Sequence, residues 1–220
     1  MSSGIDGCKS GWIVSSIHNK KLSIQYYSSL DNVKLLSTTN IIIDMPVTCP
    51  KTILNYPRNA DKKAKSFLGR NHASIFYAPV THWLKMNLNA INKECQLLHK
   101  PKLSIQSYNL FSKIKEVNRS RYYNYLWESH PECVFKRWNN NMSLPSKKTV
   151  NGRLLREKIL YEKLKFYGIS NFISIIDQFK SQHSTGYCND DIFDSLSMAI
   201  LGIEKKNKQT IKYFSKNFLY

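Results

Sequence analysis

The sequence predicts an α/β protein whose mixed five-stranded sheet is flanked by helices. Three strand-like segments open the chain, a fully apolar strand follows, and helices then alternate with one more strand. This order fits a mixed sheet with an antiparallel hairpin at its front. A β/α barrel is excluded, because its eight repeated units need about 250 residues and the chain has 220.

The opening strands are rich in Ile, Val and Tyr, which favour extended structure. We expect strands over Ser2–Asp6, Trp12–Ile17 and Leu22–Tyr27, and the polar residues 18–21 are a suitable hairpin connection. Ile41–Met45 is apolar on consecutive residues, as in a strand that is buried on both faces. These segments supply four of the five strands.

Residues 57–120 are predicted to form a helical insertion after the fourth strand, within one domain over residues 1–220. Gly69 follows the first helix of this region and is a suitable helix terminator. The expected helical segments are Leu30–Ser37 (or a loop), Asn59–Leu68, Thr81–Leu98 and Leu103–Lys113, and Ser74–Pro79 is expected to be extended.

The last part of the chain is predicted to supply the fifth strand and two long helices. Gly168 follows the clearer helix and fits a C-terminal cap, while Asn189 or Asp190 is the expected N-cap of the other. The segments are a strand at Tyr122–Ser129, a surface loop at 138–152, helices at Arg153–Tyr167 and Asp190–Glu204, and a tail at 205–220 that ends in a short strand or helix.

The composition is that of a folded protein, with 42% hydrophobic and 12% aromatic residues. No apolar run approaches the roughly 18–20 residues of a membrane-spanning helix. No secretory signal is expected, and a cytoplasmic location is the prediction. The five cysteines are dispersed and never spaced as CxxC, which argues against a disulfide framework or a zinc site.

The net charge of +18 favours a polyanionic partner, nucleic acid in the first place. A second interpretation stays open. Lys, Asn, Ile and Tyr are all abundant, as in proteins from genomes rich in A and T, and the charge would then have no binding role. The sequence does not indicate an oligomeric state.

Three aspartates are unusual for their surroundings. Asp6 ends the first strand beside Gly7, where active groups of open α/β sheets collect. Asp44 ends a strongly apolar strand, and Asp194 interrupts an apolar helix sequence. Each has an ordinary alternative, a turn for Asp6 and a structural ion pair for the other two. As a set they predict a shared acidic site.

Two further carboxylates are candidate companions of this site. Asp191 precedes Asp194 by three residues and therefore lies on the same flank of the helix. Glu128 is an inward-facing candidate at the end of the fifth strand, and Glu132 is the second choice there. His130 is a candidate proton shuttle or a hydrogen-bonded structural histidine.

Carboxylate oxygens are the ligands that hard divalent cations prefer. Two such ions can activate water and stabilise the leaving oxygen of a phosphodiester. We therefore expect two Mg²⁺ or Mn²⁺ ions held by Asp6, Asp44 and Asp194. Cationic side chains near them would hold the nucleic-acid backbone, and the candidates are Lys9, Arg58, Arg70 and Arg153, with Lys147 and Arg156 as further possibilities.

Several sequence segments resemble, in the same order, a family described as predicted RNase H-like nucleases, domain-of-unknown-function family 429. The matching pieces are GIDGCKSGW, IIIDMP, RNADKKAKSFLGRNHASIFYAP, KIKEVN, WESHPE and DDIFDSLSMAI. They extend from Gly4 to Ile200. The last piece also resembles the closing helix of Holliday-junction resolvases. The resemblance implies an RNase H-like fold with Asp6, Asp44, Asp191 and Asp194 as metal ligands and Glu128 as an additional ligand or base.

The first functional hypothesis is a metal-dependent nuclease that hydrolyses phosphodiester bonds by a two-metal mechanism. Two alternatives from other classes remain. One is a catalytically silent nucleic-acid-binding module of the same fold. The other is a phosphotransferase of the actin and sugar-kinase type, whose first strand also ends in Asp beside a Gly turn. Such proteins normally need a second domain, for which this chain has no room.

Overall fold

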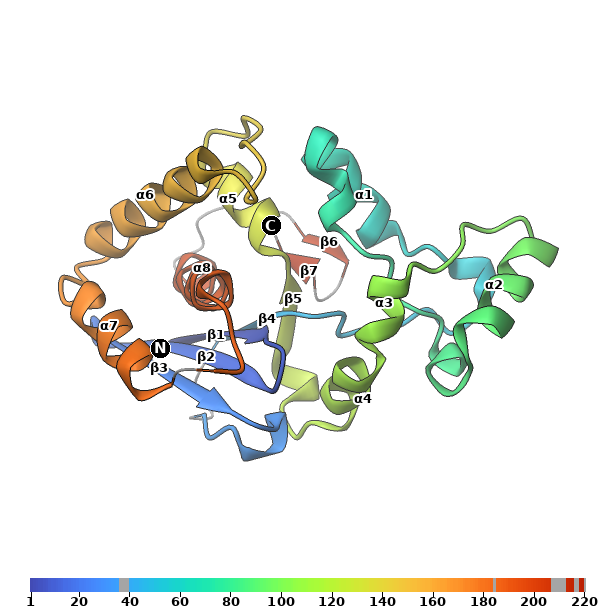
Figure 1. Cartoon of the computed structure of the whole chain (residues 1–220), viewed down its shortest axis with the longest axis horizontal. Helices are drawn as coiled ribbons and strands as arrows, with labels where there is room; N and C mark the ends of the chain where they lie inside the picture. Colours follow the sequence, from blue (N-terminus) through green and yellow to red (C-terminus); the bar gives the residue numbers. More distant parts are fainter. Residues whose placement is uncertain (36–39, 184, 207–212, 216–217, 220) are drawn as a thin grey trace.

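A mixed sheet of five strands forms the centre of the molecule (Figure 1). The computed structural model describes residues 1–35, 40–183, 185–206, 213–215 and 218–219. The strands lie in the order β3-β2-β1-β4-β5, with β1 antiparallel to β2 and parallel to β4. Their bounds are Ser2–Gly7 (β1), Trp12–His18 (β2), Lys21–Tyr27 (β3), Asn40–Asp44 (β4) and Leu126–Ser129 (β5). The predicted α/β class and five-stranded open sheet are confirmed, and they are consistent with an RNase H-like arrangement.

Two short C-terminal strands extend this sheet beyond β5. Strand β7 (Phe218–Leu219) pairs parallel with β5, and β6 (Tyr213–Ser215) pairs antiparallel with β7. The tail was expected to end in a short strand or helix, and strands form there. Residues 207–212, 216–217 and 220 of that tail lie outside the described residues.

Helices cover both faces of the sheet (Figure 1). On one face α2, α3 and α4 pack with Ile5, Ile41 and Ile43, and on the other α5 to α8 pack with Ile13 and Ile17. Four α-helices lie between β4 and β5 and four follow β5. Their bounds are Asn59–Leu68 (α1), Leu88–Leu97 (α2), Ile105–Asn109 (α3), Phe111–Arg119 (α4), Pro131–Trp138 (α5), Val150–Phe166 (α6), Phe172–Gln182 (α7) and Asn189–Lys206 (α8). The 3₁₀ segments are Leu30–Asn32, Ile53–Asn55, Gly69–Ser74, Thr81–Lys85 and Tyr123–Tyr125.

Helix α8 lies directly on the backbone of β1. A Cβ atom on Gly4 would stand 2.0 Å from the carbonyl oxygen of Ser195, so only glycine allows this approach. The hydroxyl of Ser2 donates to the carbonyl oxygen of Ala199, and the hydroxyls of Ser15 and Ser195 lie 2.7 Å apart. Small residues therefore hold α8 against the sheet and fix the position of its acidic side chains.

Several element boundaries differ from the expectation. Residues Tyr123–Tyr125 form a 3₁₀ turn, so the fifth strand begins only at Leu126. The helix expected over Leu103–Lys113 is two helices that meet at Leu110. The expected loop 138–152 is shorter, because α5 includes Trp138 and α6 begins at Val150 with Thr149 as its N-cap. Gly168 does adopt the left-handed conformation expected after that helix, at φ 73°.

Three other differences concern helix ends and unforeseen helices. Helix α8 already begins at Asn189, so Asn189 and Asp190 lie inside it. Helices α5 and α7 were not foreseen. Of the segment Leu30–Ser37, the first residues form a 3₁₀ turn and residues 36–37 lie outside the described residues. No helix in the described ranges is long and apolar enough to cross a membrane.

Candidate active site

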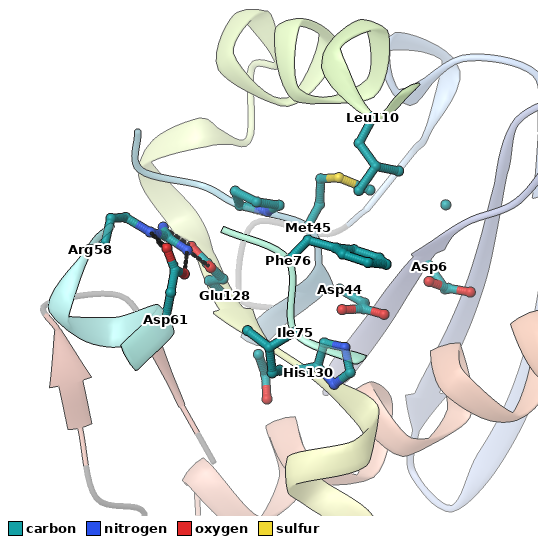
Figure 2. Close-up of a pocket in the computed structure, with 13 residues that line it drawn as sticks. Asp6, Asp44, Met45, Arg58, Asp61, Ile75, Phe76, Leu110, Glu128 and His130 are labelled. Carbon is teal, nitrogen blue, oxygen red and sulfur yellow. Dashed lines mark hydrogen bonds and ion pairs between the residues drawn. The ribbon is translucent and has the colours of Figure 1, made fainter. Parts of the chain in front are cut away.

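Asp6 and Asp44 meet at the carboxyl edge of the sheet. They are register partners on the adjacent parallel strands β1 and β4, and such strands lie about 4.8 Å apart. Both side chains share the face of the sheet that α8 covers, since Gly4 on β1 and Ile42 on β4 contact that helix. Asp6 is only 6% exposed, and Figure 2 shows both carboxylates at the same pocket.

Helix α8 brings Asp194 to these two residues. Asp194 is 8% exposed, and its Oδ2 lies 3.3 Å from the Nζ atom of Lys147. The negative charges of Asp44 and Asp194 both raise the pKa of Asp6, which places the three carboxylates within electrostatic reach of one another. The structure thus brings together the three aspartates that the sequence predicts.

Asp191 stands at the entrance of this group, in the first turn of α8. Its side chain accepts a hydrogen bond from the N–H of Cys188 at 2.8 Å, as a carboxylate does in the third position of a helix cap. Its charge also raises the pKa values of Asp6 and Asp44. Asp191 is therefore close to the site and also caps the helix that carries Asp194.

Burial is the main cause of the unusual electrostatics. Desolvation and the neighbouring carboxylates raise the pKa of Asp6 well above its ordinary value. Desolvation also raises the pKa of Asp44 and that of Asp194 to about 7, although the charge of Lys147 opposes both shifts. The raised pKa values mean that full ionisation of all three acids, with Lys147 as the ion-pair partner of Asp194, is unfavourable unless further positive charge is supplied.

The loop that holds Lys147 is fixed by a buried ion pair. Arg156 on α6 binds Glu132 on α5 through two bonds of 2.8 and 2.6 Å. The same guanidinium donates to the carbonyl oxygen of Pro145 at 2.8 Å, and Asn71 donates to that of Leu144 at 3.0 Å. Lys147 is thus presented to Asp194 by an ordered segment, and Asp194 raises the pKa of Lys147.

Glu128 lies apart from the three aspartates, on the other face of the sheet. Its register partner on β4 is Ile43, which packs into the core on the side of α2 to α4. Both carboxylate oxygens of Glu128 accept hydrogen bonds from Arg58, at 2.9 and 2.6 Å. Glu128 therefore takes part in an ion pair, while it also lines the pocket of Asp6 and Asp44 and its charge raises the pKa of Asp44.

Arg58 and Asp61 complete a buried triad with Glu128 (Figure 2). The triad holds two chain segments that frame the pocket. Glu128 accepts the N–H of Val47 at 2.9 Å, just after β4, and Asp61 accepts the N–H of Ala78 at 3.1 Å. The Arg58 side chain is 10% exposed and is bound within this triad at the edge of the pocket, and its contact with nucleic acid stays a prediction.

The other predicted basic contacts lie at the surface. Lys9, Arg70 and Arg153 are exposed, and Arg153 donates to the carbonyl oxygen of Lys148 at 3.3 Å. Arg156, in contrast, is buried in its ion pair. Three of the four named contacts thus remain available to a bound polyanion.

His130 caps helix α5 beside the carboxylates. Its Nδ1 accepts the N–H of Glu132 at 3.2 Å. Burial lowers the pKa of His130, and an accepting Nδ1 suits the neutral ring. The hydrogen-bonded histidine considered in the sequence is therefore present, and it also lines the pocket.

The pocket has about 170 Å³ of open volume and two chemically distinct sides. Asp6, Asp44 and His130 form the polar side near α8. The apolar part of the lining contains Met45, Pro46, Ile75, Phe76 and Leu110, and the ion-paired Arg58, Asp61 and Glu128 line the pocket as well. Phe76, Asp61 and the pairing of Glu132 with Arg156 were not foreseen. Asp61 pairs locally with Arg58 but acts through Glu128, and Glu132 and Arg156 are 24 positions apart.

The donor chemistry of the three aspartates fits a hard divalent cation. Buried carboxylates with too little positive charge around them are stabilised by such an ion. Within the described ranges, no three His, Cys, Asp or Glu side chains already surround one point as a metal site. Binding of a cation would therefore compete with Lys147 for Asp194.

The fold and the site define an α/β protein whose buried aspartates converge at the carboxyl edge of a mixed five-stranded sheet. Over residues 4–213 the chain matches the family model described as protein of unknown function (DUF429). The chain therefore belongs to this family, as the sequence segments indicated. No curated protein and no solved structure matches it.

Proposed function

We propose that the protein is a metal-dependent nuclease that hydrolyses phosphodiester bonds of nucleic acid. The observation that supports this most directly is the register pair of the buried Asp6 and the partly buried Asp44, which lies beside the buried Asp194 and its ion-pair partner Lys147. Such a group gains stability when a divalent cation neutralises it. Two Mg²⁺ or Mn²⁺ ions are the proposed cofactors.

Each residue of the site has a role in this proposal. Asp6, Asp44 and Asp194 would hold the ions, which when bound supply an activated water and stabilise the leaving oxygen. Asp191 keeps the first turn of α8 in place through its bond to Cys188. His130, neutral and buried at the pocket, is placed to exchange a proton with solvent or substrate.

The charge of the chain supports nucleic acid as the substrate. A net charge of +18 attracts a polyanion over long distances, and Lys9, Arg70 and Arg153 are exposed for contact with phosphates. An acidic centre inside a cationic surface is what backbone binding and cation binding together require. A cytoplasmic location stays a prediction from the sequence.

Metal binding and cleavage should be measured together. We expect calorimetry to detect Mn²⁺ binding and labelled single-stranded, duplex and branched DNA and RNA to be cleaved only with Mg²⁺ or Mn²⁺. The variants Asp44→Asn and Asp6→Asn should lose both Mn²⁺ binding and cleavage. Cleavage should fall at least 100-fold, since the ions are expected to supply several kcal/mol of transition-state stabilisation. The matched control is Asp177→Asn, an exposed aspartate on α7.

The alternative of a catalytically silent binding module makes a different prediction. It predicts that nucleic acid binds equally well with EDTA and with Mn²⁺, and that none of the substrates is cleaved. Unchanged nucleic-acid binding by Asp44→Asn would agree with that alternative. Lack of Mn²⁺ binding by the wild-type protein would overturn the nuclease proposal.

A further inference from the structure

Phe76 is an exposed aromatic side chain at the edge of the candidate active site. It is 38% exposed and lines the same pocket as Asp6 and Asp44. In Figure 2 its ring is directed toward the side of the pocket where these two carboxylates lie. Among the side chains that the structure describes, it is a member of no hydrophobic cluster. Its ring therefore contributes little to the core.

The segment around Phe76 is held on both sides. The N–H of Ile75 donates to the carbonyl oxygen of His72 at 3.2 Å, and the Ile75 side chain is buried. On the other side, the Tyr77 ring packs edge-on against that of Tyr56, and Asp61 of the buried triad accepts the N–H of Ala78. The ring of Phe76 is thus presented by an ordered backbone, which lowers the entropic cost of binding a partner.

The surroundings of Phe76 indicate the chemistry of that partner. The apolar side of the pocket accepts a flat, weakly polar group, while the carboxylates a short distance away suit a cation-bound phosphate. A nucleotide unit combines these two properties. The open volume of about 170 Å³ is below the roughly 300–1,000 Å³ of pockets that enclose drug-sized ligands. The pocket therefore fits one ring system and has no room for a base pair.

We propose that Phe76 is a stacking platform for one unpaired nucleobase and that the substrate is therefore single-stranded or locally unpaired nucleic acid. This inference rests on the proposed nuclease function and names its substrate class. Bases within a duplex already stack on their neighbours, so a face becomes available to Phe76 only when the base is unpaired or turned out.

The test measures binding without cleavage. Fluorescence anisotropy with Ca²⁺ in place of Mg²⁺ compares three probes of equal length: a single strand, its duplex, and an abasic strand that keeps the phosphates and lacks the bases. We expect the wild-type protein to bind the single strand most tightly. Loss of one base–aromatic stack by Phe76→Ala should weaken that binding about 5- to 150-fold and leave abasic-strand binding unchanged.

Two further variants complete the design. Phe76→Trp should restore binding of the single strand, because a larger ring also stacks. Phe166→Ala removes an exposed phenylalanine of α6 and should change nothing. Thermal unfolding of each variant establishes that it is folded.

Equal binding of the single strand by Phe76→Ala and wild type, or a preference of the wild type for duplex, would overturn the stacking platform. Failure of the nuclease proposal is a separate result. It would be recorded as absence of Mn²⁺-dependent cleavage while the Phe76-dependent binding of the single strand persists. The two proposals can therefore fail independently.

Discussion

The molecule contains two kinds of buried acidic residue, and they differ in their counter-charges. Glu132, Glu128 and Asp61 are bound by the guanidinium groups of Arg156 and Arg58. Asp6, Asp44 and Asp194 share one lysine. The first kind is enclosed in a completed hydrogen-bond network with its own guanidinium, whereas the second kind retains a demand for positive charge. A buried acid whose oxygens are fully bonded is therefore structural, and this includes Glu204 with Lys163 and Trp138. One whose oxygens are not fully bonded is a candidate for function.

The geometry of the ion pairs shows the same difference. Arg156 and Glu132 are joined by two bonds, and each side chain is 6% exposed. Lys147 makes one bond of 3.3 Å to Asp194 and is 42% exposed. A planar guanidinium matches a carboxylate at two points, while an ammonium acts as a point charge. Lys147 can consequently be displaced by another cation with less loss than Arg156.

The largest effect is expected where a completed pair is broken. Arg156→Met leaves Glu132 buried without a partner and also releases the carbonyl oxygen of Pro145, so the free energy of unfolding should fall by about 3–5 kcal/mol. Urea unfolding measures this change. Arg153→Met, at an exposed position of the same helix, should change it by less than about 0.5 kcal/mol. Equal effects of the two substitutions would mean that the buried pair has no special role.

Replacing one of the three aspartates that lack an arginine partner by a neutral residue should raise the free energy of unfolding instead of lowering it. Asp44→Asn removes charge repulsion and desolvation, so we expect the metal-free protein at pH 8 to gain about 1–3 kcal/mol. This range lies below what about 1.36 kcal/mol per pKa unit would give, because the new amide must also find hydrogen-bond partners in the desolvated site. Chemical unfolding in EDTA measures it. A loss of stability comparable to that of Arg156→Met would show that Asp44 is a structural acid.

The third expectation is a dependence of stability on pH in the metal-free protein. The folded-state pKa values of Asp44 and Asp194 are about 7, above the roughly 3.9 of an unfolded aspartate. Their protonated forms therefore stabilise the fold fully below about pH 4, and this contribution is lost as the pH rises through about 7. The difference between wild type and a double Asp44→Asn, Asp194→Asn variant should show this decline between pH 5 and 8. A constant difference over that interval would contradict the assignment.

Much of the site could be predicted because its charged residues stand in segments that are otherwise apolar. Asp44 ends an apolar strand and Asp194 interrupts an apolar helix, and both conflicts are visible without a structure. Asp6 gained its meaning from the parallel pairing of β1 with β4, which the structure shows. Local patterns therefore identified the three acids, and the topology brought them together.

The rest depends on contacts that no local pattern contains. The face of β5 that carries Glu128 is fixed by its register with Ile43, 85 positions earlier in the chain. Helix α7 has the sequence FISIIDQFKSQ, whose adjacent isoleucines resemble strand composition until its packing against β3 is known. Helix α5 is only eight residues long and begins at Pro131, which first suggests the end of a segment. Phe76 is distinguished only by its place at the pocket.

The close packing of α8 against Gly4 has a consequence for how sequence variation can change this protein. Any larger residue at position 4 would push the helix away from β1 and carry Asp194 with it. The acidic group would then be dispersed although every aspartate is still encoded. In a saturation-mutagenesis map, position 4 should consequently be as intolerant as position 6. A relative could thus lose the activity through one substitution at a residue that has no functional group.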